Sequence, residues 1–72
     1  MAQQAARNRD LADVVRARRK DLGLTQVEVA ELAGVSDRFV MEFERGKPTV
    51  RLDKLTAVLE AMGLTLRAEV RQ

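Results

Sequence analysis

The side chains best suited to chemistry in this sequence are cationic, and they are concentrated in two blocks. The first block spans residues 7–20 and the second spans residues 45–54, whereas the segment between them is rich in carboxylates. The cations of the two blocks are Arg7, Arg9, Arg16, Arg18, Arg19, Lys20, Arg45, Lys47, Arg51 and Lys54. Because lysine and arginine bind phosphate, the blocks predict a polyanion-binding surface if the fold brings them to one face. The alternative is a solvated surface of mixed sign, consistent with a net charge of +2.

Catalytic and metal-binding chemistry have little support in the composition. The chain contains no histidine and no cysteine, which removes the commonest general base, the thiolate nucleophile and most transition-metal ligands. It also lacks a glycine-rich phosphate loop, and helix caps and surface pairs account for its carboxylates. We therefore expect a protein that is not an enzyme and that needs no cofactor or metal. With no cysteine, no signal-peptide pattern and no apolar run of about 20 residues, we expect it to be cytoplasmic.

Apolar periodicity and capping residues predict the elements that position these charges. Apolar side chains spaced three and four residues apart indicate helices over residues 10–22, 25–33, 36–44 and 51–62. Thr25 and Glu28 form a capping-box pattern, Ser36 is a good cap for the next helix, and Gly34 suits the turn between them. Two short capped helices joined by such a turn are typical of a helix-turn-helix, whose second helix enters the DNA major groove.

The two ends of the chain follow different patterns. Residues 1–9 are expected to be a flexible N-terminus before a helical domain at residues 10–63. Residues 64–70 alternate apolar and polar side chains, which predicts a strand within a C-terminal dimerisation segment, residues 64–72. A lone strand cannot satisfy its backbone groups, so we expect it to pair with a second copy, with a disordered tail as the alternative. The apolar face of this strand comprises Leu64, Leu66, Ala68 and Val70.

A set of residues in register between Val15 and Leu64 carries a family resemblance. The set is Arg19, Gly23-Leu24-Thr25-Gln26, Ala30, Ala33-Gly34-Val35-Ser36 and Glu44-Arg45-Gly46-Lys47. On these residues the chain resembles the Xre/Cro-like helix-turn-helix repressors. The resemblance implies a mainly α, lambda-repressor-like domain of four to five helices that binds double-stranded DNA at a palindromic operator. Dimerisation would place two recognition helices about one DNA turn apart, as such an operator requires.

A narrower resemblance covers the second half of the chain. Phe39-Val40, residues 42–55, residues 58–64 and the terminal strand are similar to HipB-like antitoxins of type II toxin–antitoxin modules. This likeness implies an antitoxin that represses its own operon and binds a HipA-like kinase toxin. The alternatives are a stand-alone transcriptional regulator without a toxin, and a protein-interaction adaptor that has lost DNA binding.

The resemblance assigns base-facing positions to the predicted helix at residues 36–44. Arg38 matches a position where its guanidinium could bind guanine O6 and N7, and the carboxylates of Asp37 and Glu42 could accept from cytosine N4. The alternative for Arg38 and Glu42 is an i,i+4 salt bridge on a solvated surface. Met41 lies on the same arc, either against a thymine methyl or as a partly buried filler.

Phosphate contacts follow from the same resemblance. Gln26 matches a phosphate-contacting glutamine, with a solvated helix-start position as its alternative, and Ser36 matches a cap that also touches phosphate. Arg45 and Lys47 match positions that grip phosphate after the recognition helix. Each such contact would steepen the salt dependence of binding, because counterions are released.

One structural pair and two departures complete the prediction. Arg19 and Glu44 match a partly buried ion pair that ties the first helix to the end of the third. The helix-turn-helix itself is net acidic, so its non-specific affinity for DNA should be weak and the flanking cations should supply affinity. Val27 is apolar where the family usually has a polar residue, so it is exposed or marks a protein contact.

Overall fold

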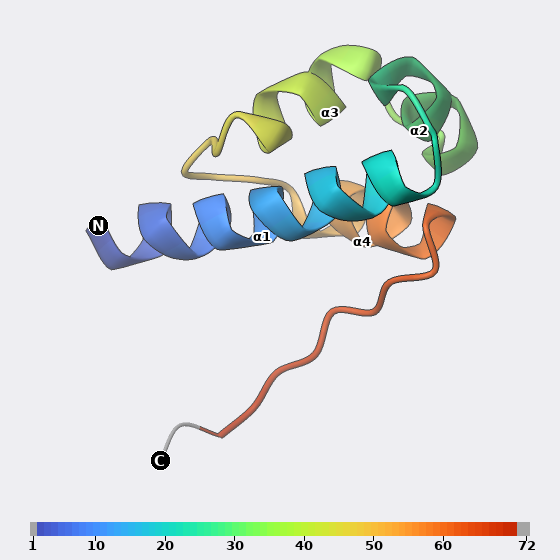
Figure 1. Cartoon of the computed structure of the whole chain (residues 1–72). Coiled ribbons are helices and arrows are strands. Elements are labelled where there is room, and N and C mark those ends of the chain that lie inside the picture. The colour runs from blue at the N-terminus through green and yellow to red at the C-terminus, as the bar shows by residue number, and fades with distance from the viewer. Residues whose placement is uncertain (1, 71–72) are drawn as a thin grey trace.

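A computed structural model describes the backbone of residues 2–70 and the side chains of residues 10–70. Within this part the chain forms four helices: α1 (Ala2–Asp21), α2 (Gln26–Ala33), α3 (Asp37–Glu44) and α4 (Leu52–Ala61). Figure 1 shows α2 and α3 together above α1, with an extended tail leaving the helices after α4. The mainly α class predicted from the sequence is therefore confirmed. None of these described helices is long and apolar enough to span a membrane.

The start of α1 differs from the prediction. The apolar pattern placed it at residue 10, whereas the helix begins at Ala2. Alanine, glutamine and arginine dominate the extension and favour helix through backbone propensity, without needing an apolar stripe. Met1 and the side chains of residues 2–9 lie outside the described part of the chain. The flexibility predicted for residues 1–9 therefore stays a prediction.

Local hydrogen bonds set the starts of α2 and α3. Thr25 Oγ1 accepts from the Glu28 amide at 3.1 Å, and the Glu28 carboxylate accepts from the Thr25 amide at 2.8 Å, which is the predicted capping box. Ser36 Oγ accepts from the Phe39 amide at 3.0 Å. Between the helices Gly34 has a φ of 71°, a left-handed conformation that glycine adopts without the steric cost of a Cβ. These contacts fix where α3 begins relative to α2.

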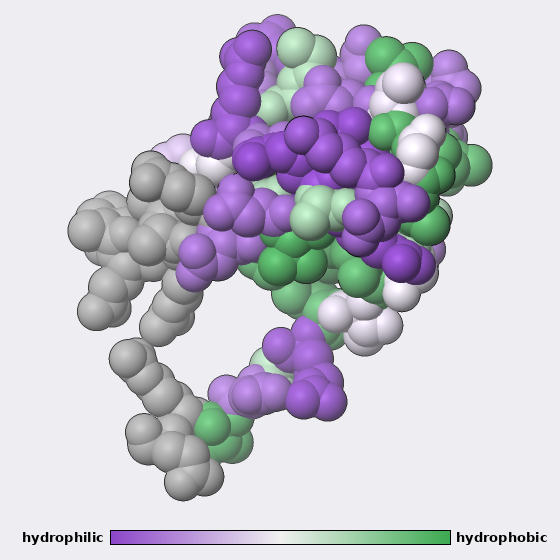
Figure 2. Space-filling model, viewed as in Figure 1, coloured by the Kyte–Doolittle hydropathy of each residue, from purple (hydrophilic) through white to green (hydrophobic). Residues whose placement is uncertain are grey.

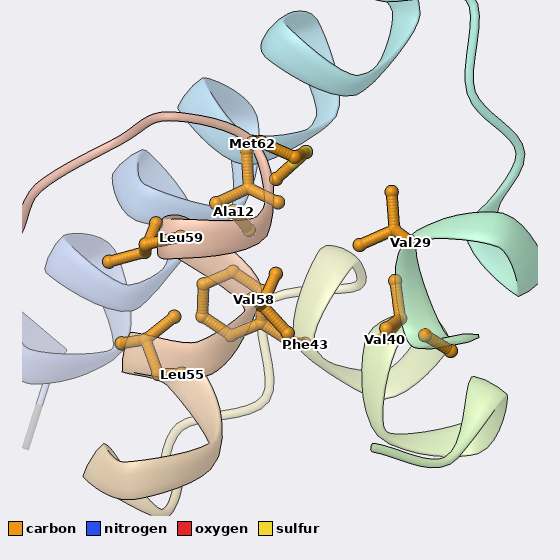
Figure 3. Packing of buried hydrophobic residues seen from close by; sticks show 10 residues of the cluster. Ala12, Val29, Val40, Phe43, Leu55, Val58, Leu59 and Met62 are labelled. Atoms are coloured by element: carbon orange, nitrogen blue, oxygen red, sulfur yellow. The ribbon is translucent and has the colours of Figure 1, made fainter. Parts of the chain in front are cut away.

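The core lies between the four helices and is aliphatic apart from one aromatic ring. Its buried members are Ala12, Val15, Val29, Ala30, Val40, Phe43, Leu55, Val58, Leu59 and Met62. Figure 3 shows Phe43 of α3 and Val58 of α4 within this one core. Burying a side chain of this size stabilises the fold by about 1.5–3 kcal/mol relative to leaving it exposed. This core therefore holds α3 by one face and leaves the opposite face to solvent.

The segment predicted as a strand, residues 64–70, forms no strand within the described chain. The amide of Leu64 donates to the Leu59 carbonyl at 2.8 Å and its side chain packs on the core, but Val70 is 90% exposed. A strand needs a neighbouring strand to satisfy its backbone groups, and the described part of this single chain supplies none. The strand is thus not confirmed, and its pairing in a dimer stays a prediction.

Candidate nucleic-acid interface

α3 presents a face of exposed side chains opposite its buried one. The side chain of Arg38 is 85% exposed, and Arg45, which caps the helix C-terminus, is also exposed. At 3.6 residues per turn, Arg38, Met41, Glu42 and Arg45 share one arc of the helix. Asp37 lies at the helix start, where its Oδ1 accepts from the Arg38 amide at 3.0 Å. The structure therefore places the predicted base-facing residues together on the outer side of α3.

Glu42 binds two cations on this face. Its Oε1 accepts from Arg38 Nε at 2.8 Å and its Oε2 accepts from Lys47 Nζ at 2.9 Å. The hydrogen bond from Lys47, followed by that from Arg38, lowers the pKa of the Glu42 carboxyl to about 2, so it is ionised at neutral pH. Glu42 holds Arg38 through Nε, whereas a bidentate contact with guanine can use the terminal amino groups. The ion pair and a base-reading role are thus compatible.

A basic hollow of about 500 Å³ lies on one side of this face. It is lined by Asp13, Arg16, Arg19, Lys20, Gln26, Met41, Glu44 and Arg45, which come from α1, α2, α3 and the α3 cap. Four of these residues are cations and two are carboxylates, so the lining carries net positive charge. The fold thus brings part of the first basic block beside a cation of the second. In Figure 2 hydrophilic side chains cover much of the surface where α1 and α3 lie together.

A second group of cations lies on the other side of α3. Lys47, Arg51 and Lys54 line a pocket of about 390 Å³ together with Phe39. Lys54 Nζ is 5.9 Å from the centre of the Phe39 ring, within cation–π range. Arg51 binds Asp53 at 2.8 Å, and this hydrogen bond lowers the pKa of the Asp53 carboxyl. Cations on both sides suit a helix lying in a major groove, since phosphate backbones form both of its walls.

Glu44 forms the centre of a polar network behind the hollow. The residue is 4% exposed, and its carboxylate accepts from Arg19 Nε at 2.7 Å and Arg19 Nη2 at 2.9 Å. This contact raises the pKa of the Arg19 guanidinium. Arg16 Nη2 donates to the Glu44 carbonyl at 2.6 Å. The pair joins α1 to α3 and is shielded from solvent on both sides.

Gln26 and Ser36, the other predicted phosphate contacts, lie at helix starts. Gln26 is the first residue of α2, and its Nε2 donates to the Glu44 carboxylate at 3.1 Å. A side-chain amide has two N–H donors, so one remains for phosphate. Ser36 caps α3 through its hydroxyl. The positive end of a helix dipole favours an anion, so both positions are compatible with a phosphate contact.

The sequence predictions did not single out two cations that the structure places at the hollow. Arg16 and Lys20 belong to the first basic block, but no role was assigned to them individually. They are four residues apart, so they lie on the same face of α1. That spacing was the available signal, but the proximity of this face to α3 depends on tertiary packing.

The capped helix pair, with its exposed second helix between two groups of cations, defines a DNA-binding protein of the helix-turn-helix class. The family profile described as Helix-turn-helix matches residues 15–68. The chain is also 38% identical over 66 residues to the uncharacterized HTH-type transcriptional regulator y4mF of Sinorhizobium fredii. That match covers 92% of this chain and 87% of the relative. The chain belongs to the helix-turn-helix family and is a DNA-binding regulator, not an enzyme.

Replacing Glu44 by alanine is expected to destabilise the fold by about 3 kcal/mol, because Arg19 would lose its carboxylate in a largely buried site. Chemical denaturation followed by circular dichroism measures the change. Glu31→Ala removes the same charge from an exposed position on α2 and should stay within about 0.5 kcal/mol of wild type. Equal stabilities for the two variants would show that the ion pair does not hold the fold.

Proposed function

We propose that the chain is a transcriptional repressor that binds a palindromic operator as a homodimer and reads its sequence with α3. The observation that carries the proposal is the exposed face of α3, centred on Arg38 and flanked on both sides by cations. Phosphate contacts position such a protein on the duplex, and base contacts give it specificity. The similar protein of Sinorhizobium fredii is named as a transcriptional regulator, which supports the regulatory role.

The proposed contacts divide into two kinds. Arg38 reads guanine, Asp37 and Glu42 offer carboxylates to base amino groups, and Met41 contacts a thymine methyl. The proposed phosphate contacts come from Gln26, Ser36, Arg45 and Lys47, to which we add Arg16 and Lys20 because both line the hollow. This division makes a clear distinction: loss of a base contact changes preference at one position, whereas loss of a phosphate contact weakens binding to every sequence alike.

Dimerisation is proposed through the tail. Among the described residues, the backbone groups of residues 65–70 make no hydrogen bond to the rest of the chain. The segment is extended in Figure 1 and keeps its apolar alternation, with Leu66 and Val70 exposed. Antiparallel pairing of two such tails would satisfy these groups and shield the apolar side chains. Leu64 differs from the other predicted members of the interface, because it already packs on its own core.

The narrower proposal is that the repressor is the antitoxin of a type II module and binds a HipA-like kinase. Its support is the resemblance of the second half of the chain to HipB-like antitoxins, together with two exposed apolar side chains on α2. Val27 is 50% exposed and Leu32 is 63% exposed, and the two lie about 140° apart around this helix. A protein partner that packs on either side chain would remove its apolar surface from water.

The first test compares Arg38→Ala with Arg45→Ala. The probe is a duplex enriched by the wild-type protein from a random library, with a random-sequence duplex beside it. Arg38→Ala is expected to lose about 1–3 kcal/mol on the enriched duplex and to relax preference at one base position. Arg45→Ala is expected to weaken binding to both duplexes equally and to lower the salt slope by about one. Fluorescence anisotropy measures both, and an unchanged preference in Arg38→Ala would refute base reading by Arg38.

The second test introduces Leu66→Pro, which removes a backbone donor from the proposed intermolecular ladder. Sedimentation should show a monomer, and the affinity for the enriched duplex should fall although no DNA-contacting residue has changed. Leu66→Ala is the matched control, because it keeps the amide and should remain dimeric. A Leu66→Pro protein that is still a dimer would rule out tail pairing.

The third test addresses the toxin. A kinase-like protein encoded beside this chain should co-purify with it, and Leu32→Asp should weaken that complex while leaving DNA binding unchanged. The absence of such a gene would favour a stand-alone regulator. A wild-type protein that binds no duplex, but does bind the neighbouring gene product, would favour an adaptor without DNA-binding function.

A further inference from the structure

Glu42 lies where the two kinds of DNA contact meet. On one side it binds Arg38, the proposed base reader, at 2.8 Å, and on the other it binds Lys47, a proposed phosphate contact, at 2.9 Å. Its side chain is 31% exposed, on the outer arc of α3. A carboxylate at the centre of a surface for a polyanion is unfavourable for affinity, so its position calls for a physical reason.

We infer that Glu42 determines specificity by exclusion: its carboxylate weakens binding to every duplex that does not place a base amino group within its hydrogen-bonding reach in the major groove. This inference rests on the proposed DNA binding through α3. It goes further, because it assigns to Glu42 a loss of binding free energy on wrong sequences as well as a base contact on the right sequence. A binder can discriminate through an unpaired charge facing the wrong partner as well as through attraction to the right one.

On a random sequence the carboxylate has two effects. It brings a negative charge into the groove between the two phosphate backbones, and its ion pair with Lys47 competes with the proposed phosphate contact of that residue. Both effects reduce the counterion release on which non-specific affinity depends. The acidic character of the helix-turn-helix therefore acts at a defined position within the interface.

On the right sequence the same carboxylate has a partner. The amino groups of cytosine and adenine are the donors that the major groove offers, and either can pair with one carboxylate oxygen. The other oxygen keeps its contact with Arg38 Nε, which orients the guanidinium towards a neighbouring base. Lys47 can then exchange Glu42 for phosphate without leaving the carboxylate unpaired.

The experiment uses Glu42→Gln, which keeps the side-chain length and removes the charge. On a random-sequence duplex this variant should bind roughly three- to tenfold more tightly than wild type, the size expected for one partly screened charge. Its salt slope should steepen by about one, because Lys47 is released from the ion pair. The ratio of affinities between the enriched and random duplexes should fall accordingly.

Two matched variants isolate the charge at this position. Glu42→Asp keeps the carboxylate, so its affinity for the random duplex should stay near the wild-type value. Glu31→Gln makes the same charge change on α2, about 140° around that helix from Gln26, and should have little effect on discrimination. Thermal melting of each variant checks that the fold is intact.

Two outcomes would overturn the inference while leaving the proposed function in place. If Glu42→Gln lowers affinity for the enriched duplex and leaves the random one unchanged, Glu42 only reads a base. If neither affinity changes, the pair with Arg38 and Lys47 has no role in binding. A wild-type protein that discriminates between no duplexes would instead refute the proposed function itself.

Discussion

A carboxylate buried in an otherwise aliphatic core loses its hydration, and the protein must replace it with hydrogen bonds. Glu44 is in this position: its carboxylate accepts from Arg19 on α1 and from Gln26 on α2, and Arg16 Nε on α1 lies 4.0 Å from it. Because these partners lie on separate helices, satisfying one charge fixes three elements relative to one another. Within the described residues no buried side-chain polar atom lacks a partner, so this requirement is met in full. The same side chains line the basic hollow, which means that the network holding the fold also shapes the surface proposed to face DNA.

Two residues earlier on α3, Glu42 has the same functional group in a different environment. It is partly exposed and its two cations can exchange it for DNA, whereas the partners of Glu44 are shielded from solvent. Burial gives Glu44 a structural role, because breaking its pair leaves an uncompensated charge in the core. Because Glu42 is partly solvated, breaking its contacts costs little free energy. This suits a residue whose partners are proposed to change on binding. One helix turn thus contains a carboxylate that fixes α3 and a carboxylate proposed to select what α3 binds.

Local chemistry made the helix-turn-helix predictable from the sequence. Thr25, Ser36 and Gly34 act on their own neighbours, and the ends of α2 and α3 lie within a residue of the predicted ones. Predictions that depended on distant parts of the chain were weaker. Val14 has the spacing of the apolar residues of α1 but is 54% exposed. Tertiary packing, not spacing alone, decides which apolar side chains of a helix other elements cover. The hydrogen bond from Gln26 to Glu44 and the position of Arg16 beside α3 depend on the tertiary structure, and the predicted tail strand would depend on a second molecule.

The distribution of charge suggests how a domain this small can be selective. Its α3 has eight residues and therefore contacts few bases, while carboxylates around it limit the contribution of phosphate attraction. Each half-site alone would then be bound weakly, with a modest preference for the right sequence. In the proposed homodimer the two half-sites are engaged together, so their free energies add and their discrimination ratios multiply. An acidic residue that weakens binding to wrong DNA would then lower the binding free energy at both half-sites. On the right operator, the linkage between the two copies would restore affinity. Weak single contacts and strong dimer-dependent selection are two consequences of the same arrangement of charges.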